Sequence, residues 1–259
     1  KTANDLPKLY NISPRRVARD LHPDYFSTQY AQSINARDVA AQHHHAHIVS
    51  CMAEHDLDGE TLGVCWDGSG YGPDGTVWGG EFLLTTRGSF QRVGFFRTFQ
   101  LPGGDQAARE PRRSALGALY EIFSEKIFNE RHLRSVRAFA KPELTVLRAL
   151  LAKSVNAPRT SSVGRLFDAV ASLVGLSQKT SFEGQAAMAL EFALNPTSAA
   201  KPYPISIERN NLGQWVVDWE PMMRRILYDQ RQAVSVARMA LKFHITLVEA
   251  LLTVAQKLK

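Results

Sequence analysis

Residues 61 to 101 contain three segments with the pattern of β-strands, and they constrain the fold more than any other part of the chain. The segments are TLGVCWDGSG, TVWGGEFLLTT and FQRVGFFRTFQL, each rich in β-branched and aromatic residues and separated by short turns. Such spacing predicts an antiparallel meander of three strands. Because helical patterns come before and after it, the sequence predicts an α/β or α+β fold in which these strands feed a helical layer.

Helical patterns dominate the rest of the chain. The elements expected before the meander are a helix over Asp5–Asn11, a strand over RVARDLHPDY stopped by Pro23, a helix over residues 27–36 and a helix over AAQHHHAHIVSCMAEH. The helices expected after it cover residues 113–126, 142–154, 164–175, 182–194 and 232–258. Residues 195–217, with Pro196, Pro202 and Pro204, read as a loop.

The composition excludes several classes of protein. The 259 residues, 44% of them hydrophobic, suffice for one large domain or two small ones, and two cysteines fit a reducing cytosol rather than a disulfide scaffold. The net charge of +6 is too diffuse for a nucleic-acid footprint, and no apolar run approaches the roughly 20 residues that span a bilayer. We therefore expect a cytoplasmic protein that binds neither nucleic acid nor membrane. It begins without methionine and within a helical pattern, so we expect a piece of a longer chain.

Histidines are concentrated in QHHHAHIVSCMAEH, residues 42 to 55, where they make up five of fourteen positions. His43 and His47 are spaced i, i+4 and would lie on one face of a helix, close enough to bind one cation, whereas His44 and His45 would point elsewhere. A zinc-protease motif would need glutamate at the position of His44, so that reading fails. A metal site, a proton-handling site and a solvated polar helix face remain the alternatives.

A glycine-rich stretch, WDGSGYG at residues 66 to 72, follows the first strand of the meander. Glycines such as Gly68 and Gly70 let backbone N–H groups approach an anion, and Asp67 could hold a divalent metal on phosphate groups. A plain hairpin turn is the alternative. An aspartate at the end of a strand that opens a meander is also the phosphate-loop layout of the actin, Hsp70 and sugar-kinase superfamily.

A basic stretch, LPGGDQAAREPRR at residues 101 to 113, contains Asp105 and three arginines. Arginine side chains suit the oxygens of carboxylate, carbamoyl or phosphate groups. We take Asp105 and Arg109 as the catalytic candidates, with Arg112 and Arg113 beside them. The alternative is a capped helix start with a basic, solvated first turn.

Two further stretches, SSVGRLFDAVASLVGL and FEGQAAMALE, each begin a predicted helix with glycine and an acid. Gly164 and Asp168 belong to the first stretch, and Glu183 and Gly184 to the second. The two acids could bind the ribose hydroxyls of a nucleotide. Alternatively they only stabilise the helix N-termini, where acids are favoured.

Six stretches in this order resemble one family. They are DLHPDYFST, QHHHAHI, DGSGYGPDGTVWGGEFL, PGGDQAAREP, GRLFDAVASLVG and FEGQAAMALE. Together they resemble the C-terminal module of the hydrogenase-maturation carbamoyltransferases, the HypF family, which is related to tRNA threonylcarbamoyl-adenosine synthases and antibiotic O-carbamoyltransferases. The resemblance covers most of the chain. It implies a two-lobed actin/Hsp70/sugar-kinase-like (ASKHA) fold, with residues 1–58 as the rest of the first lobe and residues 59–259 as a second lobe incomplete at its C-terminal end.

The resemblance also implies roles for particular residues. The implied ligands of a divalent iron or zinc ion are His43, His47 and Asp67. The implied nucleotide-binding residues are Asp67, Gly68, Gly70, Gly164, Asp168, Glu183 and Gly184. The metal and the arginines would neutralise the phosphate of the leaving group, and a dry cleft would protect the reactive carbamoyl carbon from water.

The activity that the resemblance implies is carbamoyl transfer. Family members use carbamoyl phosphate and ATP to make a carbamoyl-adenylate, and this module passes the carbamoyl group to the C-terminal cysteine of a partner, HypE. The product is later dehydrated to the cyanide ligand of nickel–iron hydrogenase. The family's acylphosphatase, zinc-finger and adenylate-forming modules are absent from this sequence, so we expect the chain alone to be incomplete for catalysis.

The acceptor thiol is expected to come from another protein. The sequence ends in AQKLK, Cys51 is expected on the inward side of its helix, and Cys65 lies within an apolar strand. Buried thiols in apolar surroundings are poor nucleophiles. Two other functions stay open, a sugar-kinase-like phosphotransferase and a non-catalytic scaffold that binds metal and nucleotide.

Overall fold

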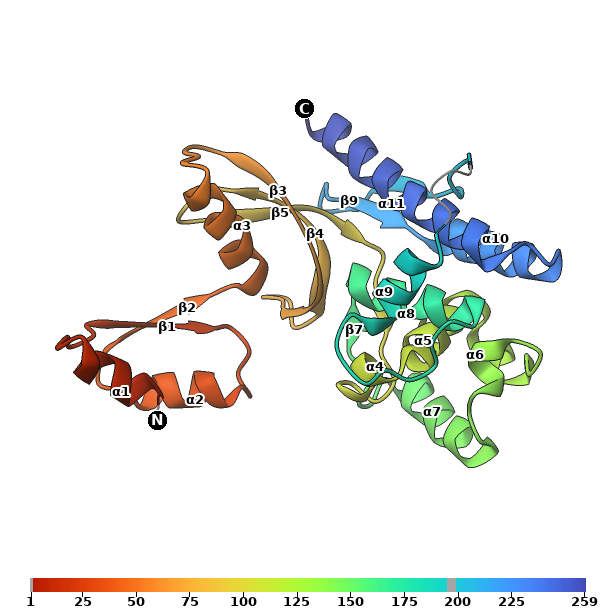
Figure 1. Cartoon of the computed structure of the whole chain (residues 1–259), viewed down its shortest axis with the longest axis horizontal. Helices are drawn as coiled ribbons and strands as arrows, with labels where there is room; N and C mark the ends of the chain where they lie inside the picture. Colours follow the sequence, from red (N-terminus) through yellow and green to blue (C-terminus); the bar gives the residue numbers. More distant parts are fainter. Residues whose placement is uncertain (1, 195–198) are drawn as a thin grey trace.

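The structure, a computed structural model, describes residues 2–194 and 199–259. Figure 1 shows an elongated molecule with a small lobe at one end, a curved sheet in the middle and a helical layer at the other end. We call α1, β1, α2 and β2 the small lobe, and everything from β3 onward the large lobe. The helix between them, α3, carries the histidines. This is a mixed α/β fold, as the sequence predicts.

The small lobe is built around two parallel strands. Its elements are α1 (Thr2–Leu9), β1 (Arg16–Asp20), α2 (Phe26–Ser33) and β2 (Arg37–Ala41). β1 pairs with β2 in parallel, which brings Asp20 opposite Ala41. The sequence does not predict β2, because the helical pattern of the histidine stretch extends back to residue 40. That helix, α3 (His43–Glu54), instead begins after Gln42, whose side chain accepts a hydrogen bond from the His45 backbone N–H at 2.8 Å.

The large lobe begins with the predicted meander. β3 (Thr61–Tyr71), β4 (Val77–Thr85) and β5 (Phe90–Phe96) pair antiparallel in sequence order, which confirms the prediction. Four shorter strands complete the sheet, namely β6 (Phe99–Gln100), β7 (Arg159–Thr160), β8 (Ser206–Arg209) and β9 (Trp215–Asp218). β7 joins β4 and β9 joins β5, both in parallel, so the sheet is mixed.

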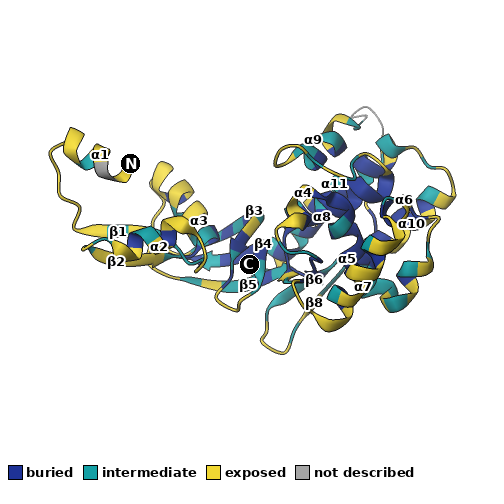
Figure 2. Cartoon of the chain, turned by 90° about the horizontal axis from the view of Figure 1, so that it is seen from below, coloured by how far each residue is buried: buried dark blue, intermediate teal, exposed yellow. Residues whose placement is uncertain are grey.

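Helices cover the sheet and supply most of the core. The longer ones are α5 (Pro111–Phe123), α7 (Lys141–Lys153), α8 (Val163–Val174), α9 (Gln185–Phe192), α10 (Glu220–Arg231) and α11 (Val236–Leu258). The short ones are α4 (Gln106–Arg109), a 3-10 helix (Ser124–Asn129) and α6 (Arg134–Arg137). Fully buried side chains from α5, α8 and α11, such as Leu119, Val170 and Phe243, belong to the same core cluster as Phe82 of β4. Figure 2 shows this burial concentrated in the large lobe.

The C-terminal third departs most from the sequence prediction. The expected loop over residues 195–217 contains β8 and the start of β9, while residues 195–198, with Pro196, lie outside the described part. The predicted helix over 232–258 starts at Val236, where Ser235 caps it, and α10 before it was missed. Short strands of this kind form only because they pair with distant partners, here β9 with β5.

The last helix also corrects the expectation about apolar runs. α11 is 23 residues long and is apolar enough, by length and composition, to cross a membrane. One such helix is weak evidence, because core helices have the same composition. Its buried residues, among them Phe243, Leu247 and Ala250, pack into the main core. The absence of a membrane partner stays a prediction.

Candidate metal and nucleotide site

His43, His47 and Asp67 converge at the junction of α3 and β3. α3 packs on the sheet through Ile48 and Met52, and this contact places its histidines beside β3. His43 Nε2 lies 3.1 Å from Asp67 Oδ2 and 3.1 Å from His47 Nε2. One donor atom from each of the three residues lies within 4.8 Å of the others. The i, i+4 pair and the strand aspartate are therefore brought together.

This donor set fits a divalent transition metal. Two imidazole nitrogens that face each other at 3.1 Å need a proton or a cation between them, and Asp67 adds a negative charge at the same point. Two histidines and one carboxylate are ligands of iron and zinc, and three protein ligands leave positions free for the oxygens of another molecule. The His47 side chain is 59% exposed, so the site opens to solvent.

Asp20 supports the candidate metal site from the small lobe. Its Oδ2 lies 2.9 Å from His43 Nδ1, on the opposite side of the ring from Asp67. Such a carboxylate holds the histidine in the tautomer that leaves Nε2 free for a metal, and it fixes the orientation of the ring. The sequence did not predict a place for Asp20 in the site. The signal that could have indicated it is an acid at the end of a strand, the same signal that indicated Asp67.

His44 corrects the expectation that it points away from the site. Its side chain is fully buried beside Trp78, and burial lowers the pKa of His44 to about 4, so the ring is neutral at pH 7. Its Nδ1 lies 3.2 Å from the Gln42 side-chain amide, and its Nε2 faces Asp67 Oδ2 at 3.8 Å. The ring therefore lies close to the carboxylate of Asp67. His45 turns away from Asp67 instead, and its Nε2 lies 3.0 Å from the carbonyl oxygen of Thr86.

The glycine-rich stretch is a bulge rather than a turn. β3 runs through it to Tyr71, and its register with β4 shifts between Trp66 and Gly70. The turn follows over PDGT, where Gly75 donates to the carbonyl oxygen of Gly72. A Cβ atom at Gly70 would lie 2.5 Å from the His44 ring, so only glycine fits there. The bulge thus runs closely past the histidine helix.

The N-terminus of α8 packs against the same bulge. A Cβ atom at Gly164 would lie 2.9 Å from both the Asp67 carbonyl oxygen and Gly68 Cα. The Ser162 hydroxyl caps α8 by accepting from the Arg165 N–H, and it donates toward the Asp67 carbonyl oxygen at 2.6 Å. Gly164 therefore allows the close approach, and Ser162, which the sequence analysis missed, holds it in place.

Two predicted nucleotide-binding acids lie near the bulge in different environments. Asp168 is 5% exposed, and burial raises its pKa to about 7 although the Arg165 guanidinium, 3.0 Å away, opposes the rise. Glu183 is exposed, and its Oε1 would lie 3.1 Å from a Cβ atom on Gly68. Gly184 directly precedes α9 and has a φ of +77°, a conformation that favours glycine.

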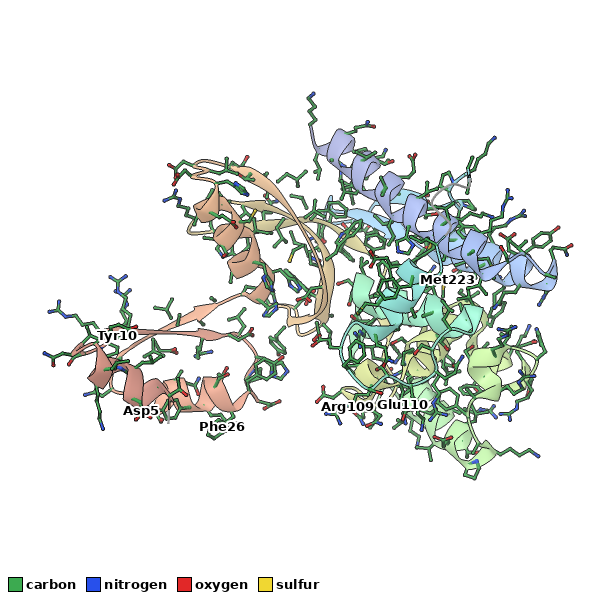
Figure 3. The ribbon with its side chains drawn as sticks, in the orientation of Figure 1. Asp5, Tyr10, Phe26, Arg109, Glu110 and Met223 are labelled. Carbon is green, nitrogen blue, oxygen red and sulfur yellow. The ribbon has the colours of Figure 1, made fainter. Side chains whose placement is uncertain are left out.

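A cavity of about 510 Å³ lies between the bulge, the small lobe and α4. Of the candidates from the sequence, Gly68, Gly70 and Asp105 line it. Its lining also includes His22, Asp24, Tyr25 and Arg165. Arg109 does not line it and is exposed at the end of α4 (Figure 3).

The neighbouring arginines are not free to bind an anion. Arg112 and Arg113 both donate to Glu110 Oε2, at 3.0 and 2.9 Å. Although burial opposes the change, hydrogen bonds from Gln106, Arg113 and Arg112 lower the pKa of Glu110 to about 2, so it stays ionised. The basic stretch at this position is thus largely a neutralised helix start.

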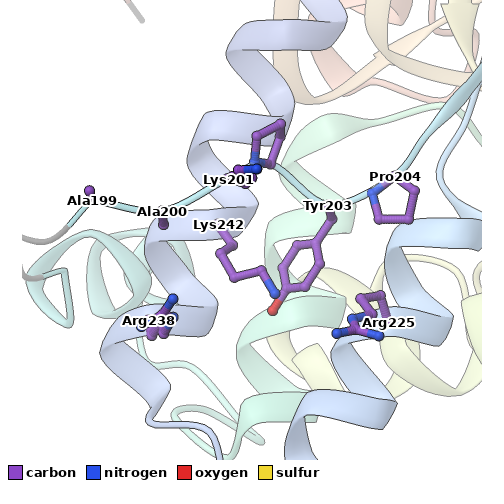
Figure 4. A pocket seen from close by; sticks show the side chains of 9 residues that line it. Ala199, Ala200, Lys201, Tyr203, Pro204, Arg225, Arg238 and Lys242 are labelled. Carbon is purple, nitrogen blue, oxygen red and sulfur yellow. The ribbon is translucent and has the colours of Figure 1, made fainter.

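A second cavity, of about 560 Å³, lies elsewhere in the large lobe and differs in chemistry (Figure 4). Its lining includes Tyr203, Arg225, Arg238 and Lys242 but none of the candidate site residues. Lys242 and Arg225 both contact the buried carboxylate of Asp229. The two cavities have similar volumes, so volume does not distinguish them. The candidate histidines and carboxylates lie beside the first cavity, which is therefore the candidate site.

The two cysteines lie outside the cavity. Cys65 is buried in β3, and burial raises its thiol pKa to about 12, as expected of a poor nucleophile. Cys51 is exposed, which contradicts the expectation that it packs inward. The inward face of α3 carries Ile48 and Met52 instead.

The fold and the site define a class of protein, namely a mixed α/β protein with a candidate metal centre beside a glycine-lined cavity. Two family models match the chain. Residues 1–54 match the HypF Kae1-like domain, and residues 63–259 match the second subdomain of the carbamoyltransferase Kae1-like domain. The chain belongs to the HypF carbamoyltransferase family.

Individual relatives agree with this assignment. Carbamoyltransferase HypF of Synechocystis sp. is 40% identical over 97% of this chain, which spans 34% of that relative's length. A crystal structure of full-length HypF in a phosphate- and nucleotide-bound form superposes with a TM-score of 0.90 and 36% identity, over 99% of this chain and 39% of that one. The crystal structure of T. kodakarensis HypF gives a TM-score of 0.75 and 33% identity, over 89% of this chain and 31% of that one.

Proposed function

We propose that the chain is the carbamoyl-transfer module of a hydrogenase-maturation enzyme with an ASKHA-type fold. Its substrate would be a carbamoyl-adenylate made from ATP and carbamoyl phosphate, and its acceptor the C-terminal cysteine thiol of a HypE-like partner. The observation that carries the proposal is the convergence of His43, His47 and Asp67 beside a glycine-lined cavity. The nucleotide- and phosphate-bound state of the similar HypF structure supports the choice of ligand.

In this proposal His43, His47 and Asp67 hold an iron or zinc ion. Bound there, the ion would supply Lewis-acid stabilisation of phosphate oxygens. Asp20 would orient His43 through Nδ1, and the buried, neutral His44 would support Asp67 from beneath. The chain would thus present a fixed set of donors to the ligand.

The bulge and the starts of two helices form the proposed nucleotide site. Gly68 and Gly70 would let backbone groups approach the phosphates, and Gly164 would keep α8 close to them. The residues proposed to complete the nucleotide site are Asp67, Asp168, Glu183 and Gly184. We keep Asp105 and Arg109 as the proposed catalytic pair. Asp105 lines the cavity, whereas Arg109 would have to reach it from the end of α4.

We also propose that the lobes divide between residues 58 and 59. The supporting observations are the end of α3 at Glu54, the start of β3 at Thr61 and the boundaries of the two family models. α3 itself packs on the sheet of the large lobe, so the candidate metal site bridges the division. A cytoplasmic location and the absence of a nucleic-acid partner remain predictions.

The test of the proposed activity uses this module within its full-length enzyme. A variant with both Cys51→Ser and Cys65→Ser should carbamoylate the partner's terminal cysteine at a near-normal rate, seen by mass spectrometry as a carbamoyl-sized mass gain. Cys51 is exposed, so burial does not exclude it as a thiol that carries the carbamoyl group before the partner does. The double variant tests whether transfer needs such a thiol. A carbamoyl group trapped on Cys51, or a folded variant without transfer, would mean a covalent relay.

The alternatives make different predictions in a simpler assay. A metal-assisted carbamoyl or phosphoryl transfer requires that the chain bind ATP only when the metal is present. A chelator should then abolish ATP binding. Phosphate transfer to a sugar in place of the mass gain on the partner would favour the kinase-like alternative. Binding without either reaction in the full-length enzyme would favour a scaffold.

A further inference from the structure

We propose that Arg165 binds the phosphoryl oxygens of the ligand in the glycine-lined cavity. This deepens the proposed function and rests on it. The sequence patterns indicated Arg109, Arg112 and Arg113 as anion-binding candidates but did not indicate Arg165. The structure instead places Arg165 at the start of α8, among the residues that line the cavity.

The side chain of Arg165 is buried yet incompletely paired. The residue is 6% exposed, and its Nε and Nη1 atoms have no hydrogen-bond partner among the described residues. Nη1 does lie 3.0 Å from Asp168 Oδ2, but the contact is not aligned as a hydrogen bond. A buried guanidinium with unused donors is costly unless a ligand completes its hydrogen bonds.

The neighbouring acid does not fully neutralise this guanidinium. Burial raises the pKa of Asp168 to about 7, so at neutral pH the carboxyl keeps its proton for much of the time. Arg112, which is similarly buried, makes a useful contrast because it donates to both Glu110 and Glu143. Arg112 is thus a structural arginine, whereas Arg165 keeps charge available to the cavity.

Arg165 is also the positively charged residue of a cavity lined by two acids. Asp24 and Asp105 line it, and Arg165 is the one lysine or arginine among the lining residues of the described chain. The Nη2 atom would lie 3.6 Å from a Cβ atom on Gly68, next to the metal-binding candidate Asp67. A phosphoryl group on the bulge could therefore contact the metal on one side and the arginine on the other.

The test compares AMP with adenosine, by calorimetry on the whole chain loaded with Zn²⁺. Arg165→Met should weaken AMP binding by about 10- to 100-fold and leave adenosine affinity within about twofold, because charged hydrogen bonds of this kind act on the phosphate alone. Arg165→Lys keeps the charge without the planar fork and should lie in between. If Arg165→Met does not fold, the lysine variant carries the comparison.

Parallel titrations identify the source of the phosphoryl group. A loss shared by carbamoyl phosphate and inorganic phosphate would support a site for a free phosphoryl group, and a loss confined to AMP would support a site for the nucleotide phosphate. Arg112→Met is the burial-matched control, which should cost stability without changing the ratio of AMP to adenosine affinity.

Two results would overturn the assignment. Equal losses of AMP and adenosine affinity in the Arg165 variants would mean that Arg165 only supports the fold, and unchanged AMP affinity would mean that it does not contact the phosphate. Failure of the proposed function looks different, because the wild-type chain with Zn²⁺ would then bind neither AMP nor adenosine.

Discussion

The small lobe and the large lobe of this molecule are stabilised to very different degrees. Of the described side chains in residues 2–41, Thr28 and Ala31 are the buried ones, while Leu9, Tyr10 and Phe26 are well exposed (Figures 2 and 3). The large lobe encloses one continuous core that reaches from β4 to α11 and includes Met223. The small lobe therefore gains little from burial within this chain.

This difference shows why the candidate site lies where it does. Asp20 comes from the weakly packed lobe, and Asp67 from a strand of the well-packed one, with His43 between them at 2.9 and 3.1 Å. A metal at this point would join the lobes through side chains rather than through a shared core. Binding to the folded state alone would also stabilise that arrangement.

A matched pair of leucine substitutions, one in each lobe, should give the largest difference in stability between the two lobes. Leu119→Ala, in the fully buried face of α5, should lower the free energy of unfolding by about 2–5 kcal/mol through lost burial and a cavity. Leu9→Ala, at a residue 75% exposed, should change it by less than about 0.5 kcal/mol. Urea denaturation measures both. Equal losses of unfolding free energy in the two variants would show that the small lobe has a core that stabilises it as much as the core of the large lobe does.

One pH-dependent contribution to stability should come from Asp168 in the large lobe. The pKa of Asp168 is raised to about 7 from 3.8, so the folded state holds a proton that the unfolded state has released. The contribution of Asp168 to stability should therefore fall as the pH rises from about 4 to 7, by up to about 4 kcal/mol. The pKa of His44, which burial lowers to about 4 from 6.5, acts in the opposite direction below about pH 6.5. The contribution of Asp168 is therefore the difference between the profiles of the unchanged chain and Asp168→Asn, and the variant should lose less stability with rising pH in thermal or urea denaturation. A profile that keeps its slope in the variant would assign the effect to another group.

A smaller effect should come from the small lobe through Asp20. Asp20→Asn removes the carboxylate that orients His43 and should weaken Zn²⁺ binding by about 10- to 100-fold. The control is Asp38→Asn, which breaks the ion pair with Arg19 in the same lobe and should leave Zn²⁺ affinity unchanged. Chelator competition measures both. Equal affinities would mean that the small lobe has no part in the metal site.

The sequence predicted the parts of this molecule that depend on local pattern. The meander follows from alternating apolar residues and short turns. The spacing of His43 and His47 places them on one face of a helix. Gly164 and Asp168 were identified because glycine and an acid at a helix start form a recognisable local signal. The structure brings these features together, while their functional roles stay proposals.

The remaining features depend on contacts between distant residues. β7 forms because Thr160 meets Val77, and no local pattern in two residues predicts that. Asp20 reaches His43 only because β1 ends beside α3, and the buried ring of His44 stacks with Trp78 from the neighbouring strand. The charge state of an arginine depends on its partners, so the sequence could not show that Arg112 and Arg113 are neutralised or that Arg165 keeps unused donors.

Metal analysis of the folded chain tests the central claim most directly. After incubation with Zn²⁺ or Fe²⁺ and gel filtration, the wild-type chain should retain one ion, and His43→Ala or His47→Ala should retain none above background. The matched control is His55→Ala, which changes an exposed histidine at the end of the same helix and should keep the ion. Equal metal content in all of these proteins, each shown to be folded by circular dichroism, would contradict the assignment of the site.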